Sequence, residues 1–265
     1  LQGATEGFIQ LIENDLTLIH LVVKRNGVKL IGEAQPIVLK DATYVESPLI
    51  LNSHDVLLRS QTLLDMDQRR SGRLGLPFTT LHTKDLFDKL RTPVLPFDLF
   101  GKDKADLAHE IQNIIDGEIA YERRDRDFVF RRRGESVSIK NTASGIKVFG
   151  LLQILIGNEF VAKNTVLIFD EPENHLHPKW QLKLAQMLVK LVDKGVYVLV
   201  SSHSPYLIEA LKRGVDREDL TNHARFCLAK NRTIEDKDSL SEIFEVLAEP
   251  FETFRQMDAE DLRDE

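Results

Sequence analysis

The chain has 265 residues, of which 42% are hydrophobic and 29% are charged, and its formal net charge is −7. This composition excludes fibrous and disordered proteins and predicts a globular fold with a substantial core. The longest apolar runs, 148–157 and 196–200, are far shorter than the about 18 residues that a membrane span needs, and no signal-like leader opens the chain. A single cysteine, Cys227, can form neither an internal disulfide nor a thiol-based zinc cluster. We therefore expect a cytoplasmic protein with no membrane partner.

The N-terminal part of the chain shows a strand-like pattern. Residues 16–24 and 28–31 flank an Asn26-Gly27 pair that suits a tight turn, and residues 42–51 continue the β pattern. Residues 1–54 are therefore predicted to form an antiparallel β segment.

The next part mixes helical spacing with turn residues. Helical spacing at 54–66 and from Leu107 to Ile115 flanks a stretch rich in glycine and proline, which predicts a helical insertion with a mobile loop over 55–117. A second β-hairpin is predicted for residues 118–139.

Residues 140–214 alternate apolar strands with helices. A strand at 165–169 ends in Asp170 and Glu171, Pro178 opens an amphipathic helix, and a second strand ends just before Ser202 and His203. Strands joined by a helical crossover run parallel, so the residues after both strands emerge at the same edge of the sheet. Two acidic groups and a histidine should therefore converge. Residues 215–265 are predicted to add a C-terminal strand and helix with an acidic tail.

A buried strand that ends in Asp-Glu has the chemistry of a phosphate-transfer site. The strand fixes Asp170 to hold Mg²⁺ through its waters, and Glu171 can orient an attacking water. Acidic residues also end strands for solubility or helix capping, so this pair alone leaves both interpretations open.

Three motifs stand together in order: NTASGIK at 141–147, VLIFDEPENHLHP at 166–178 and VLVSSHSPYLIEAL at 198–211. They resemble the signature loop, the Walker B strand with its D-loop, and the switch histidine of ATP-binding cassette (ABC) ATPases. The resemblance is strongest to the non-transporter, AAA-type branch. This branch includes the overcoming-lysogenization-defect proteins, the RecF and SMC heads, and ATPases of bacterial anti-phage systems. The resemblance covers about residues 141 to 212.

This resemblance implies an α/β fold with an ABC-type P-loop NTPase core, and ATP and Mg²⁺ as cofactors. It implies that Asp170 positions Mg²⁺ through water, that Glu171 polarises the lytic water, and that His203 senses the γ-phosphate. The residues that it implies for nucleotide contact are Ser144, Gly145, Lys147 and Asn174.

Two positions depart from the family pattern. The signature serine corresponds to Ala143 or to Ser144, depending on the register, and His177 stands where transporter cassettes carry aspartate. An anion-binding role of the signature loop has independent physical support, because a glycine-containing loop at a helix N-terminus offers free N–H groups.

The phosphate-binding Gly-x-x-x-x-Gly-Lys-Ser/Thr loop, Walker A, is absent from these 265 residues. The only Gly-Lys pair, Gly101-Lys102, is followed by Asp103 and lacks the earlier glycine. In the resembling family this loop lies near the N-terminus, so we expect that a preceding segment supplies it and that the chain alone is not an active ATPase.

Two function classes stay open. The first is an ATP-hydrolysing head that acts as a homodimer or with a head-to-head partner, in DNA-related or anti-phage work with a nuclease or DNA-associated effector. The second is a non-catalytic, cassette-derived scaffold. The missing loop favours the scaffold for this chain, whereas Glu171 and His203 favour the ATPase for the longer protein.

A metal site is an alternative interpretation of the same histidines. His175, His177 and His203, with Glu171 and Glu173 nearby, could bind zinc or manganese. The ABC interpretation explains these residues more fully.

The segment 121–133 holds six arginines with Phe128 and Phe130 interleaved, a composition that could bind nucleic acid. The favoured interpretation is a hairpin with aromatic side chains in the core and solvated charges.

Overall fold

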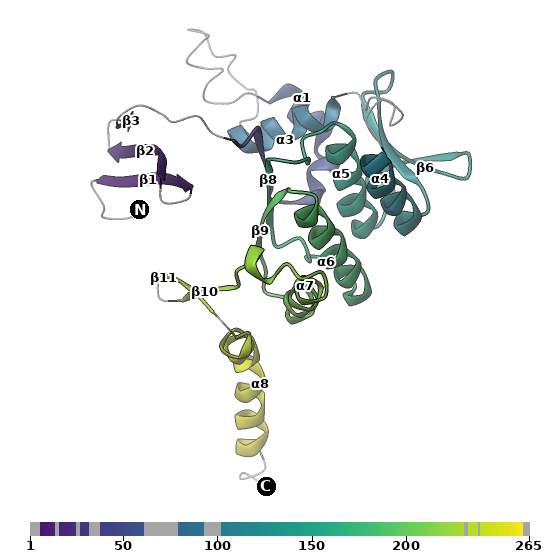
Figure 1. The fold of residues 1–265 in the computed structure, drawn as a ribbon. Helices are drawn as coiled ribbons and strands as arrows, with labels where there is room; N and C mark the ends of the chain where they lie inside the picture. The colour runs from purple at the N-terminus through teal and green to yellow at the C-terminus, as the bar shows by residue number, and fades with distance from the viewer. Residues whose placement is uncertain are drawn as a thin grey trace. The chain divides into compact units, whose positions relative to one another are not determined.

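The computed structural model describes residues 6–13, 16–24, 27–31, 38–60, 79–92, 102–230, 233–237 and 239–261. The chain forms two compact units, Leu1–Lys40 and Asp41–Glu265 (Figure 1).

The first unit is an antiparallel three-stranded sheet in the order β1-β2-β3. Its strands are β1 (Glu6–Glu13), β2 (Leu16–Lys24) and β3 (Gly27–Leu30). In β1 and β2, Gln10 lies opposite His20, and in β2 and β3, Val22 lies opposite Lys29. The antiparallel pairing predicted for residues 16–31 is confirmed, while Asn26 of the expected turn lies outside the described residues.

The second unit contains a parallel sheet in the order β4-β8-β9. Its strands are β4 (Asp41–Val45), β8 (Thr165–Asp170) and β9 (Tyr197–Ser201), α6 (Pro178–Asp193) connects β8 to β9, and α7 (Pro205–Arg217) follows. The predicted parallel β-α-β unit and the α/β fold class are confirmed. Leu167 and Phe169 of β8 are fully buried and belong to the core that also includes apolar residues of α6.

One strand prediction was wrong. Residues 42–51 were expected to be an antiparallel strand, but β4 ends at Val45 and pairs parallel with β8. The chain then enters the 3-10 helix η1 (Pro48–Asn52), because Pro48 has no N–H for a ladder and the Ser47 side chain accepts a hydrogen bond from Leu49 N–H.

Between η1 and the second sheet, the described residues form the α-helices α1 (His54–Arg59), α3 (Leu81–Arg91) and α4 (Lys102–Ile115). The helix expected near 107–115 is confirmed. In contrast, α3 interrupts the stretch that was predicted as a mobile loop. Its start has a recognisable signal, because Thr80 is the N-cap and accepts a hydrogen bond from Thr83 N–H. The rest of that predicted loop, 61–78 and 93–101, lies outside the described residues.

The predicted second hairpin is an antiparallel sheet of three strands, in the order β5-β6-β7. These are β5 (Glu118–Glu122), β6 (Asp127–Arg132) and β7 (Glu135–Ser138), followed by the 3-10 helix η3 (Ile139–Asn141). Arg133 and Gly134, both with positive φ, close the turn that adds the third strand. Phe128 and Phe130 are buried, as the hairpin interpretation predicted.

Helix α5 (Ser144–Gly157) is almost entirely buried, with twelve of its 14 residues buried. It packs against α4, β5 and η1. A Cβ atom on Gly150 would stand 1.9 Å from Ile119 Cδ1 of β5, so the close approach of helix and strand requires glycine there.

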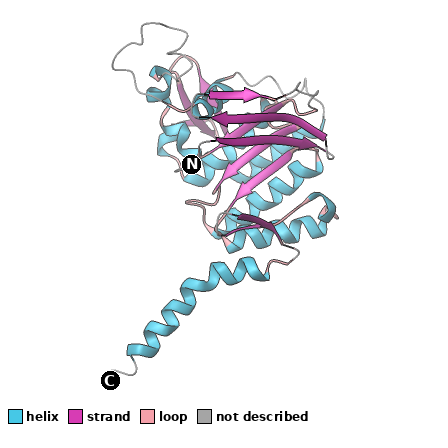
Figure 2. Cartoon of the chain, turned by 90° about the vertical axis from the view of Figure 1, so that its left-hand side faces the viewer, coloured by secondary structure: helices cyan, strands magenta, loops and turns pink. Residues whose placement is uncertain are grey.

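The chain ends in η4 (Thr221–His223), a hairpin of β10 (Cys227–Lys230) and β11 (Thr233–Asp236), and α8 (Ser241–Asp261). Figure 2 shows α8 as a long helix beyond the hairpin. Within the described ranges, no helix combines the length and the apolar character needed to cross a membrane.

Candidate functional site

The carboxyl ends of β8 and β9 lie side by side. Asp170, the last residue of β8, is in register with Ser201, the last residue of β9. The Ser201 hydroxyl donates a hydrogen bond to Asp170 Oδ1, and the Tyr44 hydroxyl donates to Asp170 Oδ2 over 3.2 Å. Three adjacent strands thus hold one carboxylate at the sheet edge, and the predicted convergence of the two strand ends is confirmed.

Sequence reasoning missed Tyr44. Burial, followed by the hydrogen bond and the charge of Asp170, raises the pKa of the Tyr44 hydroxyl above its usual 10.0, so this group remains a hydrogen-bond donor at neutral pH. The signal that could have revealed it is the run DATYV, which is a short β-branched and aromatic strand compatible with a parallel sheet.

Glu171 has a left-handed backbone, with φ of 42°, directly after the strand. Its N–H donates to the Ser201 carbonyl oxygen at 3.1 Å and also lies 3.2 Å from Ser201 Oγ. A non-glycine residue in this region is strained, and hydrogen bonds to the neighbouring strand hold it in place. The structure therefore fixes the direction in which the Glu171 side chain leaves the sheet.

The Glu171 carboxylate joins two further residues that the sequence singled out. Its Oε1 lies 3.0 Å from His203 Nε2, and its Oε2 accepts a hydrogen bond from Asn174 Nδ2 over 2.8 Å. The His203 side chain is 81% exposed and that of Glu171 is 39% exposed. The cluster is therefore open to solvent, and a water or a phosphate can reach it.

Glu173 is a buried carboxylate that ties the two loops together. Its Oε1 accepts hydrogen bonds from the Ser202 hydroxyl at 2.7 Å, from His203 N–H at 2.8 Å and from Ser204 N–H at 3.2 Å. Its Oε2 is buried without a hydrogen-bond partner. A carboxylate that binds consecutive backbone N–H groups fixes the loop that carries His203. Sequence reasoning considered Glu173 only as a metal ligand and missed this role.

The same connection continues into α6. The Ser204 hydroxyl, which caps α7, donates to Gln181 Oε1 over 2.5 Å, and Gln181 Nε2 donates to the Leu176 carbonyl oxygen over 3.0 Å. All of these atoms are buried. A continuous hydrogen-bond network therefore connects the loop after β8 with the loop after β9. A displacement of one loop would strain the other.

The predicted signature residues lie at the first turn of α5. Gly145 is buried against Trp180 of α6, and a Cβ atom there would stand 2.6 Å from the indole ring. Ser144 is half-buried, and the N-cap Ala143 makes no side-chain capping bond. Lys147 is buried, and its Nζ lies 3.4 Å from the Lys140 carbonyl oxygen. Burial lowers the pKa of the Lys147 ammonium. The contact with Trp180 places this turn beside the start of α6.

Two histidines of the alternative metal site, His177 and His203, have defined contacts. His203 contacts Glu171, and His177 Nδ1 accepts a hydrogen bond from Lys179 N–H as the N-cap of α6. No group of three or more His, Cys, Asp or Glu side chains suited to a metal ion occurs in the described part of the chain.

A magnesium ion that is bound through its water molecules needs fewer protein ligands than such a cluster provides. One carboxylate suffices when phosphate oxygens and waters complete the shell. Asp170 fits this requirement, because each of its oxygens accepts one hydrogen bond and keeps a further lone pair for a water of the ion.

Three arginines at the end of β6 and in the following turn have acidic partners. Arg131 pairs with Glu122 and Glu118, and both Arg132 and Arg133 contact Asp116. The hydrogen bond to Glu122 raises the pKa of the Arg131 guanidinium. These pairings agree with the favoured interpretation of a solvated hairpin.

A protein-family model described as "AAA domain, putative AbiEii toxin, Type IV TA system" matches residues 45–209 of this chain, which is more than half of it. Over 72 residues the chain is also 39% identical to "ABC-type transporter cns4" of Cordyceps militaris. That stretch is 27% of this chain and 5% of the fungal protein, so the chain spans only a small part of that relative's length.

Among solved structures, an SMC head bound to the C-terminal winged-helix domain of ScpA is 12% identical, with a TM-score of 0.45 and coverage of 91% of this chain and 77% of the other. The SMC head domain from Thermotoga maritima is 12% identical, with a TM-score of 0.37 and coverage of 88% and 72%.

Proposed function

Because this chain belongs to the AAA domain family whose model spans residues 45–209, we propose that it is the C-terminal portion of an ABC-type head that binds and hydrolyses ATP. The observation that carries the proposal is the cluster at the sheet edge. Glu171 contacts both His203 and Asn174 there, next to an Asp170 that two hydroxyl groups hold.

The proposed roles follow from the chemistry of each group. Bound Mg²⁺ would neutralise charge on the phosphates, and Asp170 would hold it through water. Glu171 would accept the proton of the attacking water, while the Asn174 amide orients the carboxylate by its bond to Oε2. His203, exposed at the same edge, would donate a hydrogen bond to the γ-phosphate. The first turn of α5 would contact the nucleotide that is bound to an opposing head, through Ser144, Gly145 and Lys147.

The contact between His203 and Glu171 defines a resting state in this proposal. With their side-chain atoms 3.0 Å apart, Glu171 Oε1 is occupied by the imidazole. When a γ-phosphate draws His203 away, that oxygen becomes available to the attacking water. The presence of the third phosphate would thus switch on the base that cleaves it.

In this proposal a segment outside the given sequence supplies the phosphate loop, and β9 supports this part of the proposal. In the described chain β9 pairs only with β8, and its Tyr197 and Leu199 are 51% and 61% exposed. Parallel sheets normally have both faces covered, so the exposed side chains of β9 indicate that a further element packs there. The side of β9 that faces away from β8 also has backbone groups that are free within the described chain and can pair with a further strand. A strand added beside β9 would deliver its following loop next to the Ser202 and His203 loop.

We propose head-to-head dimers, a cytoplasmic location and work on DNA or in anti-phage defence on the same basis, with a nuclease or DNA-associated effector as the partner class. The alternative is a scaffold without its own chemistry. One observation favours the alternative: these 265 residues hold no glycine-rich phosphate loop.

Replacing Glu171 by glutamine tests the proposal in a longer chain that includes the phosphate loop, or in the presence of that segment. The amide cannot accept a proton, so hydrolysis should fall by about 10²-fold or more while ATP binding persists and ATP-bound dimers accumulate. Glu209→Gln, which removes an α7 carboxylate paired with Arg213, is the matched control and should hydrolyse ATP normally. Unchanged hydrolysis in Glu171→Gln would support the scaffold.

A further inference from the structure

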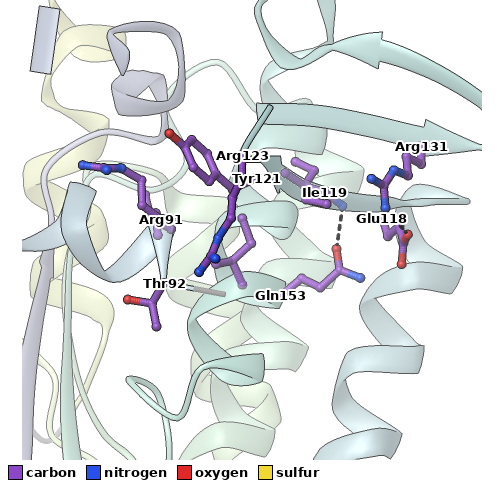
Figure 3. Close-up of a pocket in the computed structure, with 11 residues that line it drawn as sticks. Arg91, Thr92, Glu118, Ile119, Tyr121, Arg123, Arg131 and Gln153 are labelled. Atoms are coloured by element: carbon purple, nitrogen blue, oxygen red, sulfur yellow. Dashed lines mark hydrogen bonds and ion pairs between the residues drawn. The ribbon is translucent and has the colours of Figure 1, made fainter. Parts of the chain in front are cut away.

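A hollow lies away from the sheet edge, where the end of α3, strand β5 and helix α5 meet (Figure 3). Its volume is about 380 Å³. The side chains around it that carry polar groups are Arg91, Thr92, Glu118, Tyr121, Arg123, Arg131 and Gln153, while Leu90, Ile119 and Ile154 are among its apolar lining residues. None of its lining residues belongs to the loops that carry Asp170, Glu171 or His203.

Arg91 is held in this hollow by two aromatic rings and one long ion pair. Its guanidinium carbon lies 5.2 Å from the Phe87 ring centroid and 5.7 Å from the Tyr121 ring centroid. Its ion pair with Asp88 is long, with 3.5 Å between Nη1 and Oδ1, and its buried Nε has no hydrogen-bond partner. The two rings thus orient a cation that retains unused hydrogen-bonding capacity.

Arg123 adds a second positive charge from the other wall. It is exposed at the end of β5, and Figure 3 shows its side chain reaching toward Thr92. Arg131 lies at the other end of the hollow and differs, because Glu118 and Glu122 take up its charge. The local charge therefore concentrates at Arg91 and Arg123, opposite the Thr92 hydroxyl.

We propose that this hollow binds a small phosphorylated molecule, of the class of nucleoside monophosphates. Arg91 and Arg123 would hold the phosphate by charge-assisted hydrogen bonds, and the half-buried Tyr121 ring would flank the uncharged part, above a floor of buried apolar side chains. The volume suits one small ligand. A nucleic-acid strand would need an open groove instead.

The floor of the hollow connects the ligand to α5. Gln153 of α5 accepts a hydrogen bond from Ile119 N–H of β5 over 3.0 Å, and the same helix begins at Ser144 and Gly145. A ligand wedged between β5 and α5 therefore touches the helix that carries the predicted signature turn. The site stands on its own geometry, whether or not the sheet edge hydrolyses ATP.

Calorimetric titration of the 265-residue protein with AMP, in EDTA to exclude Mg²⁺, tests the site. We expect saturable binding that Arg123→Glu weakens about tenfold or more. Arg124→Glu is the matched control, because it makes the same charge change in the same turn outside the hollow, and it should leave the affinity within about twofold. Arg91→Lys should also weaken binding, with thermal unfolding measured to confirm its fold.

Three results would overturn the proposal: no AMP binding by the wild-type protein, equal weakening by Arg123→Glu and Arg124→Glu, or loss of binding in Glu171→Gln. The last result would place AMP at the sheet edge. Binding of a short single-stranded oligonucleotide in place of AMP, lost equally in both arginine variants, would assign the turn to nucleic acid. Unchanged AMP binding by Glu171→Gln supports the hollow, even if the hydrolysis proposal fails.

Discussion

The sheet edge at β8 and β9 and the antiparallel sheet of β5 to β7 both concentrate charged side chains, but the charges are organised differently. At the sheet edge, Glu171 and Glu173 accept hydrogen bonds from residues of the two loops, so several residues form one unit. In the antiparallel sheet, Arg131 and Arg132 each pair with an acidic neighbour at the surface.

This difference shows that the number of arginines in a segment does not tell how many of them lack an acidic partner. Arg131 pairs across the strands with Glu122, and Arg132 and Arg133 share Asp116, which precedes β5. All three arginines thus have an acidic neighbour, and such exposed ion pairs add little net stability. Buried hydrogen bonds at the sheet edge instead fix geometry, and their loss leaves unsatisfied groups. Substitutions at the edge should therefore have larger effects than those in the antiparallel sheet.

The largest effect on stability is expected for Glu173→Ala. The substitution leaves Ser202, His203 and Ser204 without their shared buried acceptor, and we expect the free energy of unfolding to fall by about 3 kcal/mol. Chemical denaturation measures this change. Glu173→Gln keeps one acceptor oxygen and should lose less, whereas equal and small losses in both variants would show that this carboxylate does not hold the loops together.

A smaller effect, on rate, is expected for His203→Ala. In a chain supplied with the phosphate loop, turnover should fall by about 10- to 100-fold with a smaller change in ATP affinity, because the hydrogen bond from His203 to the γ-phosphate strengthens as charge develops in the transition state. Steady-state and binding measurements separate the two. His175→Ala, at an exposed histidine of the preceding loop, is the control. A bound metal that is present in the wild-type protein and lost in His203→Ala would contradict this role.

The smallest effect is expected for Asp116→Asn in the antiparallel sheet. The hydrogen bond from Arg132, together with the charges of Arg132 and Arg133, lowers the Asp116 carboxyl pKa below 3.8. The stabilisation by this group is therefore fully present above pH 3.8 and is lost as the pH falls through the folded-state pKa. Asparagine tolerates the left-handed backbone at this position, where φ is 51°.

Wild type and Asp116→Asn should consequently differ slightly in stability at pH 7, and their difference should shrink in acid. Urea denaturation at pH 7 and at a pH below 3.8 measures the difference in stability between the two proteins. Asp125→Asn in the β5–β6 turn is the control. A difference that grows as the pH falls would contradict the lowered pKa.

Much of the sheet edge could be predicted from the sequence, because a parallel β-α-β unit brings both strand ends to one edge whatever the rest of the fold does. Asp170, Glu171 and His203 follow from that topology alone. Tyr44 could not be found in this way, since it lies 126 residues before Asp170 on a strand that was expected to be antiparallel.

Two other features also required coordinates. Glu173 follows Pro172 in a loop, where no periodicity indicates whether a carboxylate faces solvent or the core. The pairing of Arg131 with Glu122 depends on the cross-strand register, and the composition of the hairpin does not define that register. The sequence analysis predicted two strands in this sheet instead of three, because Arg133 and Gly134 gave no strong turn signal.

Titration of the 265-residue protein with Mg-ATP tests the central claim most directly. Without a glycine-rich loop the triphosphate loses its cradle of N–H donors and its lysine, and Asp170 and Glu171 repel it. With the AMP hollow disabled by Arg123→Glu, so that only the sheet edge is tested, we predict no measurable affinity by calorimetry at micromolar protein, and recovery of ATPase activity when a segment with the phosphate loop is added, covalently or as a separate chain. Hydrolysis by the 265 residues alone that disappears in Glu171→Gln would contradict this account.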